Sequence, residues 1–183
     1  MTQDSYVKGI KRIIINENEI KTKISEAGKY IDSLYDGRPI LLVGILKGCF
    51  VFLSDLMRNV SVPCEVAFIA AQSYYDGIDS SGNVDIIMDL KKEVSGYHVI
   101  IVEDIIDTGR TLSEIFRRFK ERHPLTLRVI TLLDKPERRI IDFNADISLF
   151  TIEDIFVVGY GLDYGEYYRN LPYIAEFNAE TIK

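Results

Sequence analysis

The chain has few cysteines and no disulfide framework. Its 183 residues contain two cysteines, Cys49 and Cys64, and both lie in apolar stretches of sequence. We therefore expect two buried free thiols, because cysteine in apolar surroundings behaves as a small hydrophobic residue. Without a set of paired cysteines there is no sign of a secreted, disulfide-stabilised scaffold. The sequence thus favours a reducing, cytoplasmic setting.

Basic residues are also in short supply. The formal net charge is −6 and the pI is about 5.0, which argues against broad binding to nucleic acid, since that needs a basic face. The longest apolar run, residues 39–53, is interrupted by Lys47 and is too short to span a membrane. The first six residues are polar and do not resemble a signal peptide. A small anionic ligand remains compatible with this balance, because a few local amides and cations can bind one phosphate group.

An ordinary globular composition is present instead, with 47% hydrophobic and 27% charged residues. A chain of this length can bury a core, so we expect residues 1–183 to form a single domain. Apolar residues spaced by three and four positions predict an amphipathic helix over residues 17–35. Further helices are expected over residues 49–58 and 111–121, and strands over residues 39–46, 65–71, 84–90, 98–102, 127–133, 147–151 and 156–158.

This alternation of strands and helices predicts an α/β fold with a mostly parallel twisted sheet flanked by helices. Residues 72–83 interrupt the pattern, because they carry Ser, Tyr, Asp and Gly without helical or strand periodicity. A connection of about a dozen residues is longer than most, which makes this segment a candidate lid.

The most informative segment follows the apolar strand at residues 98–102. Glu103 and Asp104 come first, then Asp107, and then Thr108-Gly109-Arg110-Thr111 leads into a helix. A Thr- and Gly-containing turn at a helix start offers N–H groups and hydroxyls to an anion. The carboxylates fit hydroxyl groups or a hard cation instead. The alternative is that Asp107 or Thr108 only caps the helix. No P-loop sequence occurs, and the combined pattern favours a ribose phosphate site.

Residues 102–111 resemble the PRPP-binding motif of type I phosphoribosyltransferases, where PRPP is 5-phosphoribosyl 1-pyrophosphate, and in particular the hypoxanthine-guanine branch. The resemblance implies that Glu103 and Asp104 hold the ribose hydroxyls, and that residues 108–111 hold the 5-phosphate. It also implies that Asp107 approaches N7 of the base as general acid/base. Arg110 stands where several members carry Lys or Leu. The family fold adds a small hood built from the terminal segments.

Two other stretches resemble the same family's phosphate-binding parts. Lys47 and Gly48 follow a predicted strand and resemble the loop that holds pyrophosphate, which carries a cis peptide bond before its lysine. Ser73 and Tyr74 resemble the start of the loop that closes over PRPP. Arg169 stands where the family's arginine reaches pyrophosphate. Taken alone, a lysine at a strand end or a polar loop would be unremarkable.

The base half of the site is implied by residues later in the chain. Lys135 would donate to the 6-oxo group of a purine, and Phe156 would stack on its ring. Backbone carbonyls near Val157 and Asp163 would accept from the base edge. An exocyclic amine, as in adenine, would face the Lys135 donor and cost affinity. The resemblance therefore implies a 6-oxopurine rather than adenine.

The resulting hypothesis is a purine salvage enzyme that converts hypoxanthine, and guanine, with PRPP into IMP, or GMP, and pyrophosphate. Xanthine remains a further candidate base. Magnesium is the implied cofactor, held by Glu103, Asp104 and Asp163, and a homodimer or homotetramer is implied. One rival is a non-catalytic PRPP-sensing regulator on the same fold, which normally carries a DNA-binding segment or a basic face. The other is a transferase for adenine, orotate or a pyrimidine, which Lys135 and Phe156 disfavour.

Overall fold

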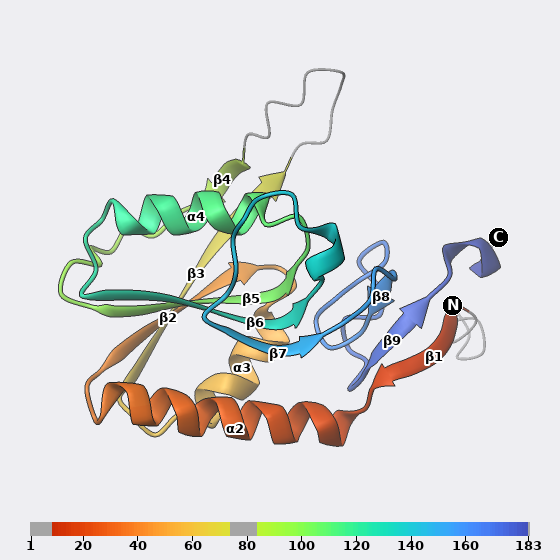
Figure 1. Cartoon of the computed structure of the whole chain (residues 1–183), viewed down its shortest axis with the longest axis horizontal. Coiled ribbons are helices and arrows are strands. Elements are labelled where there is room, and N and C mark those ends of the chain that lie inside the picture. The colour runs from red at the N-terminus through yellow and green to blue at the C-terminus, as the bar shows by residue number, and fades with distance from the viewer. Residues whose placement is uncertain (1–8, 74–83, 183) are drawn as a thin grey trace.

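A six-stranded sheet forms the centre of the molecule (Figure 1), in a computed structural model that describes residues 9–73 and 84–182. The strand order is β4-β3-β2-β5-β6-β7, and every neighbouring pair is parallel except β3 and β4. The strands are β2 (Ile40–Leu46), β3 (Cys64–Ser73), β4 (Val84–Met88), β5 (His98–Ile106), β6 (Thr126–Asp134) and β7 (Ile147–Thr151). The predicted mostly parallel α/β fold is confirmed.

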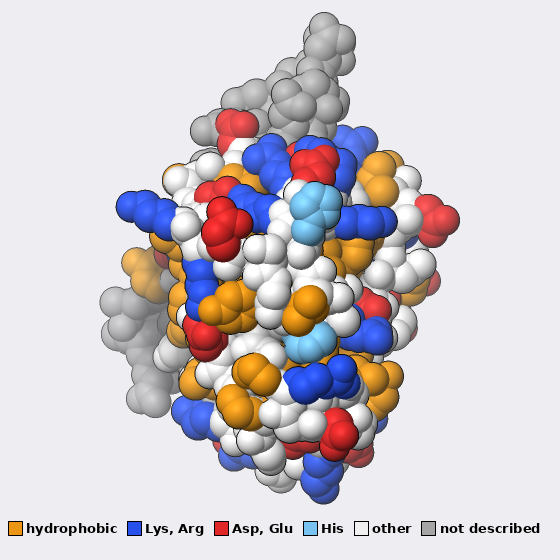
Figure 2. All heavy atoms as spheres, turned by 90° about the vertical axis from the view of Figure 1, so that its left-hand side faces the viewer, with side chains coloured by type: hydrophobic (Ala, Val, Ile, Leu, Met, Phe, Trp, Pro, Cys, Tyr) orange, Lys and Arg blue, Asp and Glu red, His pale blue; other side chains and the backbone are white. Residues whose placement is uncertain are grey.

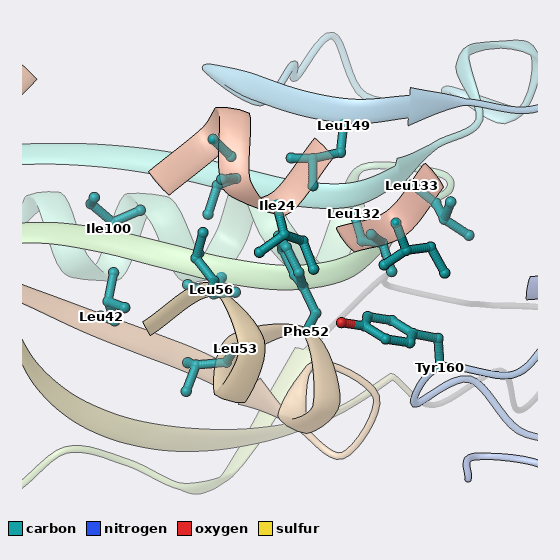
Figure 3. Packing of buried hydrophobic residues seen from close by; sticks show 14 of the residues in the cluster. Ile24, Leu42, Phe52, Leu53, Leu56, Ile100, Leu132, Leu133, Leu149 and Tyr160 are labelled. Atoms are coloured by element: carbon teal, nitrogen blue, oxygen red, sulfur yellow. The ribbon is translucent and has the colours of Figure 1, made fainter. Parts of the chain in front are cut away.

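Helices cover both faces of this sheet. Helices α2 (Glu17–Tyr35) and α3 (Phe50–Arg58) lie on one face, and α4 (Arg110–Lys120) lies on the other (Figure 1). Alternate residues of β5 point to opposite sides, so Ile100 and Val102 join the core beneath α2 and α3, while Ile101 joins the core beneath α4. Figure 3 shows the first of these cores, where residues of α2, α3, β5, β6 and β7 converge.

The start of α2 is defined by a capping box. The Asn16 side chain accepts hydrogen bonds from the N–H groups of Asn18 and Glu19, and the Glu19 carboxylate accepts from the Asn16 N–H at 2.8 Å. This reciprocal pair satisfies N–H groups that the first helical turn leaves without partners. At the other end, Asp36 adopts a left-handed conformation with φ of 47°.

A second, three-stranded sheet has the order β1-β9-β8, and both pairs are antiparallel. It consists of β1 (Ile10–Ile15), β9 (Ile174–Phe177) and β8 (Val157–Val158), and the short helix η2 (Ala179–Ile182) follows it. Figure 1 shows this sheet beyond the ends of β5 and β6. Its two longer strands come from the terminal segments, so it is the hood that the resemblance implied.

Two details differ from the sequence-based expectations, and one expectation is not tested. Strand β5 continues to Ile106 instead of ending at Val102, because residues 103, 105 and 106 still pair with β6. Cys49 is buried as expected, but Cys64 is partly exposed at the first position of β3. Of the candidate lid, residues 74–83 lie outside the described residues.

The surface opposite the hood carries Lys and Arg interspersed with Asp and Glu, with hydrophobic side chains scattered between them (Figure 2). Across residues 9–73 and 84–182, no helix is both long enough and apolar enough to cross a membrane.

Candidate functional site

A cavity of about 690 Å³ opens where the carboxyl ends of β2, β5 and β6 meet the segment that carries β8. Ligands of open parallel sheets bind at this edge, and the volume is typical of small-molecule sites. The predicted site residues that line it are Lys47, Gly48, Asp104, Asp107, Lys135, Phe156, Val157, Asp163 and Arg169. Residues from four separate parts of the chain are thus brought together.

A smaller cavity of about 130 Å³ lies between the end of β5 and the start of α4. It is lined by Glu103, Asp107, Thr108, Gly109 and Thr111, together with neighbouring apolar residues. Gly109 precedes the helix with φ of 82°, a conformation that glycine adopts without strain. A helix start beside a glycine turn offers backbone N–H groups to an anion.

Arg110 is the first residue of α4, and it is not among the residues that line either of these two cavities. Its backbone N–H lies 3.4 Å from the Thr108 hydroxyl oxygen, to which it donates. The Arg110 position therefore contributes its backbone to the turn.

Glu103 and Asp104 lie inside β5 and line different cavities, while their carboxyl groups interact with each other. Glu103 faces the smaller cavity and Asp104 the larger, because consecutive strand residues point to opposite faces. Burial raises the pKa of both carboxyls, and the charge of Asp104 together with a hydrogen bond between the two carboxyl groups raises the pKa of Glu103 further. Glu103 Oε2 is buried and has no hydrogen-bond partner among the described residues.

The Lys47 loop packs tightly against the acidic strand and against the segment after β8. The Leu46–Lys47 peptide bond is cis, as the resemblance implied. A Cβ atom on Gly48 would lie 1.5 Å from Asp104 Oδ2, and one on Gly161 would lie 2.1 Å from the Gly48 carbonyl oxygen. Only glycine allows these two approaches, so both positions set the shape of the cavity.

Cations and carboxylates alternate at the mouth of the cavity. Lys47 Nζ lies 2.9 Å from Glu166 Oε1. Arg169 Nη2 lies 2.9 Å from Asp163 Oδ1 and 3.2 Å from Glu166 Oε2. The Arg169 guanidinium is also held by the Gly161 carbonyl oxygen at 2.8 Å. Lys47 and Arg169 are therefore placed to face one anionic group together.

Asp107 follows β5 and is paired with an arginine that the sequence analysis did not identify. Arg138 Nε lies 2.9 Å from Asp107 Oδ1. The two groups form an ion pair, but they are not oriented for a hydrogen bond. Arg138 Nη1 also lies 3.4 Å from Asp154 Oδ1. In the sequence, only its position points to Arg138. It lies three residues after Lys135, which is one turn of the 3₁₀ helix η1 (Pro136–Arg138).

Lys135 is a buried lysine at the end of β6, with 6% of its surface exposed. Its ammonium group donates to the Ile155 carbonyl oxygen at 2.6 Å and lies 4.0 Å from Asp154 Oδ1. Burial lowers the pKa of Lys135, and the charges of Asp107 and Asp154 oppose that shift. A buried donor in a cavity wall can select between an acceptor and a donor on a ligand.

Phe156 presents an exposed aromatic ring to the cavity, with 52% of its surface accessible. Its ring lies edge-on to Tyr164, with centroids 6.0 Å apart, and 6.1 Å from the Phe177 ring. Val157, the next residue, is buried in β8. The hood thus supports one aromatic face that a planar ligand could stack on.

The remaining predicted residues belong to the lid segment. Ser73 ends β3, and its side chain lies outside the described part of the structure. Tyr74 lies outside the described residues. Glu166 and Asp154 join Arg138 as charged residues that the sequence analysis missed, because an acidic residue in a turn is usually solvated and carries no distinct pattern.

The donor set is compatible with a hard cation. Within the described ranges, no three His, Cys, Asp or Glu side chains converge as a complete metal cage. Magnesium does not require one, since it commonly binds through one or two carboxylates and takes its other ligands from water and substrate phosphates. The Asp104 and Asp163 carboxylates, which both line the larger cavity, supply oxygen donors of that kind, whereas Glu103, the third predicted ligand, lines the smaller cavity.

Comparisons with known proteins agree with this geometry. The family model of the phosphoribosyl transferase domain matches residues 10–165. The hypoxanthine-guanine phosphoribosyltransferase of Streptococcus pneumoniae is 43% identical over 172 residues, covering 94% of this chain and 96% of that protein. The hypoxanthine phosphoribosyltransferase of Salmonella typhimurium is 45% identical, covering 93% and 97%. A crystal structure of a hypoxanthine phosphoribosyltransferase from Staphylococcus aureus superposes with a TM-score of 0.90 at 40% identity, covering 96% and 95%.

Proposed function

The chain belongs to the phosphoribosyltransferase family, and from this premise we propose that it is a purine salvage enzyme. It transfers the 5-phosphoribosyl group from PRPP to hypoxanthine or guanine, giving IMP or GMP and releasing pyrophosphate. The observation that carries the proposal is one cavity with the Lys135 donor and the Phe156 ring at one side and the Lys47 and Arg169 cations at the other. A base and a pyrophosphate group can therefore flank one sugar.

The sugar phosphate lies against β5 and the start of α4. The N–H groups and hydroxyls of residues 108–111 bind the 5-phosphate, because a helix start favours an anion. Glu103 and Asp104 accept hydrogen bonds from the ribose hydroxyls. The orphaned Glu103 oxygen supports this role, since a buried carboxylate oxygen without a partner is costly unless a ligand satisfies it.

Pyrophosphate lies between Lys47 and Arg169, beside the backbone of Gly48. Two cations facing one position neutralise negative charge that grows as the C1–O bond breaks. Arg169 can also use its planar fork to bind two phosphate oxygens at once. When bound, magnesium would add Lewis-acid stabilisation of the same charge. Asp104 and Asp163, which line the same cavity, would supply its protein ligands.

The base is held by the hood side of the cavity. Lys135 donates to the 6-oxo group, Phe156 stacks on the ring, and the backbones of Val157 and Asp163 accept from its edge. Asp107 lies beside N7 and exchanges a proton with the base as N9 attacks C1. Its ion pair with Arg138 keeps the carboxylate near the cavity wall in the free protein.

The proposal is tested by supplying the purified protein with PRPP, magnesium and single bases. We expect pyrophosphate and the matching nucleotide to form with hypoxanthine and guanine, and much more slowly with adenine. Xanthine is included as well, so that the rates with the three bases show which substituent at position 2 of the purine the site prefers. Absence of turnover with every purine would reject the enzymatic function, and turnover with adenine alone would reject the role of Lys135.

We also propose that residues 1–183 act as one phosphoribosyltransferase domain in the cytoplasm, as a homodimer or homotetramer. The free thiols of Cys49 and Cys64 support a reducing compartment. Phe50 and Met57 support self-association, because both are exposed apolar residues seven positions apart on α3. Sedimentation velocity with the full chain distinguishes monomer, dimer and tetramer.

A further inference from the structure

Glu166 places a carboxylate between the two cations that we assign to pyrophosphate. Its Oε1 lies 2.9 Å from Lys47 Nζ, and its Oε2 lies 3.2 Å from Arg169 Nη2. Both oxygens of one anionic group are therefore engaged by the pair that would bind phosphate oxygens. Asp163 does not bridge the two in this way, since among the described residues it forms an ion pair with Arg169 and not with Lys47.

The backbone at Glu166 is held in a conformation that favours glycine. Residues 165 and 166 join Tyr164 to Tyr167, which pair as an antiparallel bridge, and their φ angles are 59° and 71°. Two-residue turns with positive φ at both central positions favour glycine at the second of them. Glutamate in this conformation is uncommon, and such residues concentrate where a side chain has a task.

Local contacts hold this turn in place without the Glu166 side chain. The Glu166 N–H donates to Asp163 Oδ2 at 2.9 Å, and Arg169 Nη1 donates to the Gly161 carbonyl oxygen at 2.8 Å. The Glu166 side chain itself is 63% exposed, so it contributes little to any core. Its recorded partners are the two cations of the site.

We propose that Glu166 occupies the place of pyrophosphate in the free protein and competes with it for Lys47 and Arg169. Without a carboxylate here, two neighbouring cations would bind pyrophosphate more tightly and release it more slowly. Pyrophosphate carries more negative charge than one carboxylate, so it displaces Glu166, and Glu166 returns as pyrophosphate leaves. This inference rests on the proposed function, because that function assigns pyrophosphate to these cations.

The opposite role is also physically sensible and gives the opposite result. If Glu166 only held Lys47 and Arg169 in position, removing its charge would loosen both cations and weaken pyrophosphate binding. The two roles therefore differ in the sign of one measured quantity, the dissociation constant of pyrophosphate.

The test is isothermal titration calorimetry of magnesium pyrophosphate into the full chain and into Glu166→Gln. We expect the dissociation constant to fall about three- to tenfold in the variant, the range for losing two exposed ion-pair competitors. Glu93→Gln is the matched control, because it removes the same charge at another exposed position and should leave the constant unchanged. Circular dichroism checks that each variant is folded.

An unchanged or higher dissociation constant in Glu166→Gln would overturn the inference, as would an equal fall in Glu93→Gln. Nucleotide formation by the unaltered protein is measured separately, so the two proposals can fail independently. Nucleotide formation without tighter binding in Glu166→Gln rejects only the competition. Tighter binding without nucleotide formation supports the competition and rejects the enzymatic function.

Discussion

At the scale of single residues, glycines determine how closely the parts of the site approach. Gly48 lies against the Asp104 carboxylate, and Gly161 lies against the Gly48 carbonyl oxygen. A methyl group at Gly48 would overlap the Asp104 carboxylate, and one at Gly161 would overlap the Gly48 backbone. The Lys47 loop, the acidic strand and the segment after β8 are therefore stacked directly on one another, which is how residues far apart in sequence share a small cavity.

Lys135 offers the clearest single-residue prediction. Lys135→Met keeps an unbranched apolar stem but removes the donor that faces the 6-oxo group. A hydrogen bond from a charged donor contributes about 1.5–3 kcal/mol, so we expect KM for hypoxanthine to rise by about 10- to 100-fold. The rate with adenine should not fall, because the donor that opposes its 6-amino group is removed. Steady-state kinetics with both bases measures this.

Lys120→Met serves as the control for Lys135→Met, since Lys120 is an exposed residue at the end of α4. Its kinetic constants should match those of the unaltered protein. An equal loss of activity with hypoxanthine and adenine in Lys135→Met would show that Lys135 supports the fold of the cavity and does not select the base.

At the scale of helices and strands, local patterns were enough for some elements and not for others. Helix α2 was predicted over its full extent, because its apolar stripe and its capping residues lie within one continuous segment. Strands β1 and β9 were not located, since they pair with each other across the whole chain. Strand β1 also has register shifts, so its buried residues do not alternate as a strand pattern requires.

The site shows the same division between local and long-range information. Glu103, Asp104 and Asp107 stand out because three acids follow an apolar strand and precede a glycine turn. Their division between two cavities was not predicted, since it depends on β5 continuing past Val102. Glu166 was missed because its partners, Lys47 and Arg169, come from two separate segments that meet only in the folded chain.

The cap of α2 gives a prediction at this scale. Asn16→Ala removes the acceptor for the N–H groups of Asn18 and Glu19, and loss of such a cap costs about 0.5–2 kcal/mol of unfolding free energy. Urea denaturation followed by circular dichroism measures the change. Asn18→Ala, in the first turn but not at the cap, should stay within about 0.5 kcal/mol. Equal losses in the two variants would contradict the capping role.

At the scale of the whole molecule, the site is built by two separate sheets. The six-stranded sheet supplies Lys47, Asp104 and Asp107 from the ends of its strands, while the hood supplies Phe156. Tyr160 joins the two parts, because it follows β8 yet points toward Phe52 in the core beneath α2 and α3 (Figure 3) and donates a hydrogen bond to Asp55 of α3. Because Phe156 and the strand-end residues come from different sheets, base and phosphate binding should still respond separately to changes in the hood.

Phe177 tests this separation, because it is buried in β9 and its ring packs against the Phe156 ring. Its ring centroid lies 4.9 Å from that of Tyr164, and its N–H donates to the Phe156 carbonyl oxygen at 2.9 Å.

In Phe177→Leu we expect KM for hypoxanthine to rise about three- to tenfold, because aromatic pairs contribute about 0.5–1.5 kcal/mol beyond burial. The dissociation constant of pyrophosphate should stay within about twofold, since Phe177 reaches Arg169 through its neighbour Tyr168, at 4.9 Å between ring centroids, while Asp163 and Glu166 hold the Lys47 and Arg169 side chains. Phe119→Leu is the matched control, because Phe119 is equally buried in the core beneath α4. Both variants should lower the unfolding free energy, but only Phe177→Leu should weaken base binding. If base and pyrophosphate binding weakened together in Phe177→Leu, the two sheets would have to act as one rigid unit.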